Sequence, residues 1–164
     1  MDYGLIGAEL ITRRLVSVLY YGESSDINDV KFQLEVNGKT SKLEIARFNR
    51  SDKLFRLELS SEVEILLGNL NVIKTNDGES RPLSYETYVT TDEFAELYTD
   101  TKTEFGALYS KEETTFVLWS PLSEKVFLKL EKTENNFVLL PLKRKDKGVY
   151  KITVKGDLFN KRYN

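Results

Sequence analysis

This chain lacks histidine and cysteine, the two residue types on which many hydrolytic and zinc enzymes depend. Its 164 residues contain no histidine and no cysteine. Ser-His-Asp and Cys-His sites are therefore excluded, as are zinc sites built from imidazoles or thiolates. The sequence also contains no glycine-rich phosphate-binding loop. We therefore expect no catalytic residue, no metal site and no cofactor in this chain.

Sugar binding requires different side chains, and these are present. The flat C–H face of a pyranose packs on an aromatic ring, while polar side chains pair with its hydroxyls. Phe127 alternates in phase with Lys125 and Lys129, whereas Val126 and Leu128 occupy the opposite face. Phe127 is thus a candidate stacking platform with Lys129 beside it. Interdomain packing and a lone exposed ring are the structural alternatives.

Trp119, the single tryptophan, is a second aromatic candidate. It is in phase with Val117, while Phe116 and Leu118 occupy the other face of the same stretch. Because both faces are apolar, the pattern favours packing of Trp119 in a core or at a domain junction, with sugar contact as the alternative. Tyr150 is in phase with apolar neighbours and is expected in the core.

Period-two alternation dominates the sequence and predicts short strands. They are expected at residues 15–21, 30–36, 42–46, 55–59, 63–67, 70–74, 85–89, 114–119, 125–130, 137–140 and 148–154. Asn37-Gly38 predicts a type I′ hairpin turn, and residues 49–52 and 76–78 predict further turns. One helical turn is expected at residues 91–97, capped by Thr91 or Asp92.

This pattern predicts an all-β fold. We expect two consecutive immunoglobulin-like antiparallel β-sandwich domains, at residues 1–98 and 99–164, with a polar linker at residues 100–104.

The balance of charge argues against polyanionic partners. The net charge is −2, from 24 basic and 26 acidic residues spread along the chain. Neither nucleic acid nor a membrane surface is an expected partner. No apolar run approaches the ~18 residues of a membrane span. The first ten residues lack the basic segment of a signal peptide, so a cytoplasmic location is expected.

Five short motifs in the second half carry a family resemblance. They are FGALYS at 105–110, TTFVLWSP at 114–121, VFL at 126–128, KGVY at 147–150 and GDL at 156–158. In order and spacing they resemble the isoamylase N-terminal domain, or family 48 carbohydrate-binding module, of debranching enzymes. Residues 10–98 resemble, in position and strand number, the all-β domain that precedes this module in type I pullulanases.

The resemblance implies a function without chemistry of its own. The chain would be a non-catalytic front region of a pullulanase-type glycoside hydrolase, with the module truncated at its C-terminus. It would help to bind or position branched α-glucan (starch, glycogen or pullulan) for α-1,6 hydrolysis by a downstream catalytic barrel. Purely structural packing on that barrel is the alternative, and an unrelated interaction sandwich is a third reading.

Overall fold

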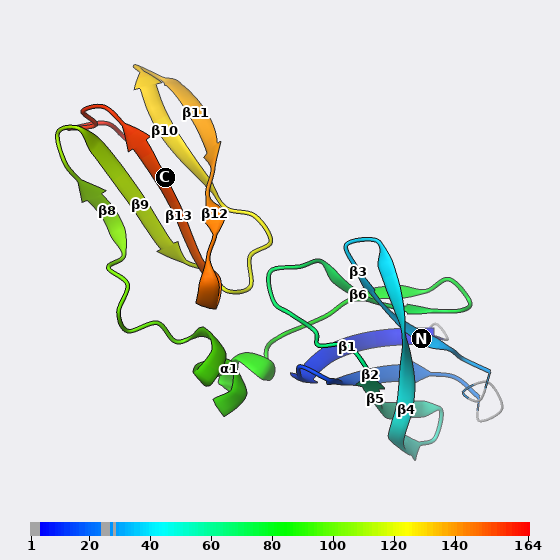
Figure 1. Cartoon of the computed structure of the whole chain (residues 1–164). Helices are drawn as coiled ribbons and strands as arrows, with labels where there is room; N and C mark the ends of the chain where they lie inside the picture. The colour runs from blue at the N-terminus through cyan, green and yellow to red at the C-terminus, as the bar shows by residue number, and fades with distance from the viewer. Residues whose placement is uncertain (1–3, 24–26, 28) are drawn as a thin grey trace. The chain divides into compact units, whose positions relative to one another are not determined.

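The chain folds into two compact units, which we call the N-terminal unit (Met1–Glu96) and the C-terminal unit (Leu97–Asn164). The computed structural model describes residues 4–23, 27 and 29–164 (Figure 1). Both units consist of antiparallel sheets, which confirms the expected all-β sandwich class. No helix in the described part of the chain is long and apolar enough to cross a membrane. The division between the two units falls after Glu96. The domain boundary expected after residue 98 stays a prediction.

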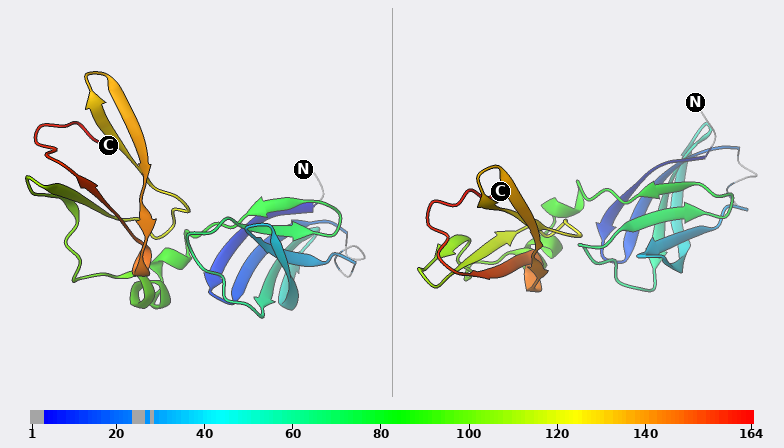
Figure 2. Two further views of the ribbon diagram at one scale, coloured as in Figure 1. Left: turned by 45° about the horizontal axis from the view of Figure 1, so that its top comes forward. Right: turned by 90° about the horizontal axis from the view of Figure 1, so that it is seen from above.

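The N-terminal unit is built on one seven-stranded sheet that curls over on itself (Figure 2). Its strands are β1 (Gly4–Thr12), β2 (Leu15–Tyr21), β3 (Phe32–Val36), β4 (Lys39–Ser51), β5 (Leu54–Ser61), β6 (Asn71–Thr75) and β7 (Ser80–Pro82). They lie in the order β1-β2-β5-β4-β3-β6-β7. The two ends of the sheet meet where Leu10 N and Ala8 O bond the backbone of Ser84, each at 2.9 Å. These two bonds pair part of the free edge of β1.

Alternate residues of the central strands fill the interior of this curled sheet. Val16 and Val18 of β2 and Leu57 and Leu59 of β5 are each fully buried. Burial of side chains of this size stabilises the unit by about 1.5–3 kcal/mol each. The alternation seen in the sequence therefore has its cause in this one-sided burial.

Turn chemistry fixes the register of the hairpins. Asn37 and Gly38 both have positive φ, at 50° and 83°, as the predicted type I′ turn requires. The predicted turn at residues 76–78 is also present, with Thr75 N bonding Glu79 O at 3.0 Å. The turn expected at 49–52 lies later than predicted, because β4 continues to Ser51 and the chain reverses at Asp52, where φ is 56°.

Two further expectations for the N-terminal unit are wrong, and one strand was missed. Residues 63–67 form a loop, in which Ile65 N bonds Arg13 O at 2.8 Å, and the alternation there serves loop packing instead. Residues 85–89 contain a 3₁₀ turn, Tyr88–Thr90, instead of a strand. Strand β1 was not expected, because register shifts between Leu5 and Gly7 and between Leu10 and Thr12 interrupt its pattern.

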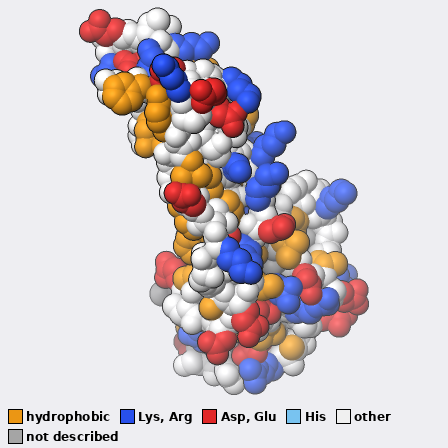
Figure 3. All heavy atoms as spheres, turned by 60° about the vertical axis from the view of Figure 1, so that its left-hand side comes forward, with side chains coloured by type: hydrophobic (Ala, Val, Ile, Leu, Met, Phe, Trp, Pro, Cys, Tyr) orange, Lys and Arg blue, Asp and Glu red, His pale blue; other side chains and the backbone are white. Residues whose placement is uncertain are grey.

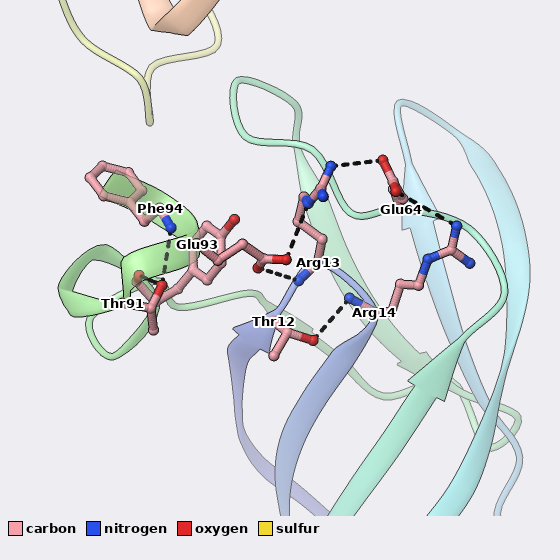
Figure 4. Close-up of polar contacts among 8 residues, drawn as sticks. Thr12, Arg13, Arg14, Glu64, Thr91, Glu93 and Phe94 are labelled. Atoms are coloured by element: carbon pink, nitrogen blue, oxygen red, sulfur yellow. Dashed lines mark hydrogen bonds and ion pairs between the residues drawn. The ribbon is translucent and has the colours of Figure 1, made fainter. Parts of the chain in front are cut away.

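The predicted helix is α1 (Asp92–Tyr98). Thr91 Oγ1 caps it by accepting a bond of 3.2 Å from Phe94 N (Figure 4). Glu93 in its first turn accepts bonds from the backbone N and the Nε of Arg13, at 3.0 and 3.3 Å. The Arg13 guanidinium also contacts Glu64 at 3.0 Å. These contacts attach the first turn of α1 to the strand connection after β1.

The C-terminal unit is a two-layered sandwich. Its strands are β8 (Gly106–Tyr109), β9 (Glu113–Trp119), β10 (Phe127–Thr133), β11 (Asn136–Pro141), β12 (Lys143–Arg144) and β13 (Val149–Lys155). One sheet has the order β12-β13-β9-β8 and the other pairs β10 with β11. Phe116, Leu128 and Leu130 form the core between the layers. Tyr150 is 1% exposed, which confirms its expected place in the interior.

The last residues of the chain extend the smaller sheet. Lys129 N bonds Asn164 O at 2.8 Å, and Glu131 N bonds Arg162 O at 2.9 Å. The segment 162–164 therefore lies along β10 on the side away from β11. This pairing brings Arg162 beside the side chains of β10.

Two of the family motifs, WSP at 119–121 and KGVY at 147–150, are in direct contact in the fold. Ser120 N bonds Gly148 O at 2.9 Å, and the Trp119 indole N–H donates to Lys147 O at 3.0 Å. Gly148 has φ of +75°, and a Cβ at this position would lie 2.9 Å from Pro121 N. The WSP motif and the KGVY motif thus hold each other in place, and glycine is the residue that fits.

Candidate functional site

The candidate site is the solvent-facing side of the β10–β11 pair, which we call the outer face. Its members are paired as Phe127 with Pro141, Lys129 with Leu139 and Glu131 with Phe137. Because side chains alternate across a strand, Leu128 and Leu130 point into the core and leave these residues outward. Leu139 is 63% exposed and Phe127 is 50% exposed. The structure therefore presents an aromatic ring and an aliphatic side chain to solvent.

The cations of the outer face are held in place by Phe137. Lys129 Nζ lies 4.7 Å from the centroid of the Phe137 ring, and the Arg162 guanidinium lies 5.7 Å from it. Arg162 is fixed in turn by Glu131, whose Oε1 accepts bonds of 3.1 and 2.5 Å from Nε and Nη2. Phe137 is thus engaged with cations, and Phe127 is the more open ring of the face.

The electrostatics of this cluster keep it charged. The hydrogen bond from Arg162, followed by the bond from its backbone N, lowers the pKa of Glu131 below its usual value. The same side-chain bond raises the pKa of Arg162. Glu131 is therefore ionised at neutral pH, and Arg162 keeps N–H groups that can serve as donors beside Lys129.

The structure brings Phe127 and Lys129 onto one surface but does not bring Trp119 to it. Trp119 lies at the end of β9, in phase with Val117 and opposite the core residue Phe116, so it faces outward from the other sheet. Its indole N–H also donates to Tyr98 O at 2.9 Å. The ring is 42% exposed. Trp119 therefore contacts the last residue of α1 and is separate from the outer face.

Sequence reasoning missed Phe137, Leu139 and Arg162. The strand at residues 137–140 was expected, but all its residues are apolar, so alternation did not reveal which of them face solvent. The position of Arg162 depends on pairing with β10, which is distant in the sequence. The sequence did offer one signal for Phe137 and Leu139. Lys129 and Glu131 mark the solvent-facing side of their strand, and the residues opposite them on the next strand face the same side.

No group of three or more carboxylate side chains is arranged to hold a metal ion in the residues that the structure covers (4–23, 27 and 29–164). The polar atoms of the outer face are cationic donors and one paired carboxylate. This donor set suits hydroxyl groups better than a metal ion.

The outer face thus combines an aromatic ring with hydrogen-bond donors on an exposed sheet of a β-sandwich. Residues 104–164 match the family model of carbohydrate-binding module 48, the isoamylase N-terminal domain. The C-terminal unit is therefore similar to this module over these residues.

The chain as a whole is similar to pullulanases. It is 25% identical over 150 residues to a pullulanase of Bacillus subtilis (strain 168), covering 91% of this chain and 21% of that protein. Its fold matches crystal structures of a pullulanase from Anoxybacillus sp. LM18-11. Superposition on the structure of that pullulanase complexed with maltotriose gives a TM-score of 0.85 at 24% sequence identity. The match covers 99% of this chain and 23% of that chain. A second structure of the pullulanase from this organism gives a TM-score of 0.83 at 25% sequence identity. That match covers 96% of this chain and 23% of that chain.

These findings confirm the resemblance to the N-terminal region of type I pullulanases. The chain spans 21% of the length of the curated relative that it matches.

Proposed function

We propose that the chain is an accessory region of a debranching enzyme and that its outer face binds α-glucan. In the full protein it would hold branched glucan near a catalytic barrel that cleaves α-1,6 linkages, in the cytoplasm. The observation that carries the proposal is the half-exposed Phe127 ring on the same sheet face as the ordered ammonium of Lys129. The match of residues 104–164 to carbohydrate-binding module 48 supports it.

The chemistry of the outer face suits a neutral polyhydroxyl chain. One glucose ring would pack its C–H face on Phe127, and Lys129 and Arg162 would donate hydrogen bonds to neighbouring hydroxyls. Each contact is exposed to water, so the affinity of one site is expected to be weak. The benefit for catalysis would come from raised local substrate concentration.

The test compares two phenylalanine variants in affinity electrophoresis through gels containing amylopectin. Phe127→Ala is expected to weaken retardation by about 2- to 10-fold, the size of one aromatic contact. Phe48→Ala is the matched control, since Phe48 is 54% exposed on β4 of the N-terminal unit. Equal retardation of both variants and the parent chain would reject the outer face as a glucan site.

A structural role is a second candidate, which the exposure of Leu139 favours. An aliphatic side chain that is 63% exposed makes no specific contact with hydroxyls and suits burial against another protein surface. The partner would be the catalytic barrel of the full protein. A Leu139→Ser variant of the full protein that melts earlier but retains its glucan affinity would support this role.

A further inference from the structure

A concave site lies in the C-terminal unit, between its two sheets. Its floor is formed by Phe116 of β9 and Leu130 of β10, which are both buried in the core. Tyr109, Phe159 and Tyr163 form its rim. We call it the aromatic pocket. Its volume is about 320 Å³, at the small end of the range for ligand sites.

The rim presents an unusual amount of aromatic surface to solvent. Tyr109 is 49% exposed, Tyr163 is 54% exposed and Phe159 is 68% exposed. Single exposed rings are common on protein surfaces, but three around one cavity mark a binding site. Figure 3 shows hydrophobic side chains, an aromatic ring among them, exposed on the upper part of the molecule, which is the C-terminal unit.

The rings of the pocket are held in place by specific contacts. The Tyr109 and Phe159 centroids lie 6.2 Å apart, and the Phe116 and Tyr163 rings meet edge to face at 5.0 Å. Asp157 Oδ1 accepts bonds of 2.9 Å from both the Tyr109 hydroxyl and Phe159 N. The pocket is therefore preformed, which lowers the entropic cost of binding.

Polar groups at the mouth of the pocket can pair with hydroxyls. The bond to Asp157 raises the pKa of Tyr109, so its hydroxyl stays neutral at physiological pH. Asn160 and Lys161 also line the pocket and offer an amide and an ammonium. Asp157 and Lys161 carry opposite charges, so the mouth as a whole favours a neutral ligand. Aromatic walls with mixed donors and acceptors match a sugar ring.

We propose that the aromatic pocket binds the terminal glucose residue of an α-glucan chain. The pocket is at the small end of the range for ligand sites, which suits a chain end better than a continuous run of sugar rings. The choice of ligand rests on the proposed function. The site is nevertheless distinct from the outer face, because its floor is formed by the core residues Phe116 and Leu130. Two contacts on one unit would raise the avidity for long chains.

The experiment uses isotope-labelled chain and two sugars, followed by amide chemical shifts. Maltotriose has chain ends, whereas β-cyclodextrin is a closed ring without them. We expect maltotriose to shift amides at residues 109 and 157–161, and β-cyclodextrin to leave these unmoved. Phe159→Ala should weaken the maltotriose shifts in the pocket by about 3- to 10-fold. Its exposure lets it be removed without loss of the fold, which an unchanged spectrum elsewhere would verify.

Two outcomes would overturn the proposal: no shift at residues 157–161 with maltotriose at millimolar concentration, or equal shifts there with β-cyclodextrin. The outer face is read separately in the same spectra. Absence of shifts at residues 127–131 and 137–141 with both sugars would reject the outer face, while pocket shifts with maltotriose alone would still support the chain-end site. The two proposals therefore fail in different places.

Discussion

Replacement of Gly148 by alanine tests the contact between the WSP and KGVY motifs. Gly148 has φ of +75°, where a residue with a Cβ pays about 1–2 kcal/mol of strain. The new Cβ would also lie 2.9 Å from Pro121 N and 2.6 Å from Pro121 Cβ, well inside the usual 3.5–4.0 Å. Relief requires movement of backbone and costs about 1–3 kcal/mol more. We therefore expect Gly148→Ala to destabilise the C-terminal unit by about 2–5 kcal/mol.

The measurement is urea unfolding followed by tryptophan fluorescence. Trp119 is the single tryptophan and lies in the C-terminal unit, so its signal reports this unit. Gly156→Ala is the matched control, because φ is +101° there but no atom lies within 4 Å of the added Cβ. It should show only the strain of about 1–2 kcal/mol. Equal losses in the two variants would refute the close approach of Gly148 to Pro121.

Three further predictions concern single polar contacts. The hydroxyl of Thr114 is buried and has no hydrogen-bond partner, so Thr114→Val should stabilise the C-terminal unit by about 1 kcal/mol in the same assay. Glu93→Gln should lower the stability of the N-terminal unit by about 0.5–1 kcal/mol, and the loss should shrink at high salt, because the Arg13–Glu93 pair is partly exposed. The Thr103 hydroxyl and the backbone N–H groups of residues 102 and 103 lower the pKa of Asp100. Its stabilising effect is therefore present above the unfolded-state pKa and lost as the pH falls through the folded-state pKa, and Thr103→Val should move the NMR titration midpoint of Asp100 upward.

The class of fold was predictable from the sequence because burial on one face imposes alternation. Strands such as β2, β3 and β5 bury every second side chain and were expected nearly at their observed positions. The hairpin turn at Asn37-Gly38 was equally predictable, since such a turn requires residues that tolerate positive φ. The same rule failed at residues 63–67, because loop side chains can also alternate between core and solvent.

The candidate site was only partly predictable. Phe127 and Lys129 were identified because they share a wet face on one strand. Phe137 and Arg162 were not, since their approach to Lys129 depends on strand register and on pairing between distant segments. Trp119 was grouped with these residues by type alone, and only the coordinates show that its indole N–H holds the backbone at Tyr98.

The most direct test of glucan binding at the outer face is a search for intermolecular NOEs between maltoheptaose and the aromatic rings. The C–H face of a stacked glucose places its H3 and H5 protons against the ring. We predict NOEs from these protons to the Phe127 ring, and weaker ones or none to Phe137, whose ring is engaged by Lys129 and Arg162. NOEs to Trp119 in their place, or to neither phenylalanine of the outer face, would contradict the assignment.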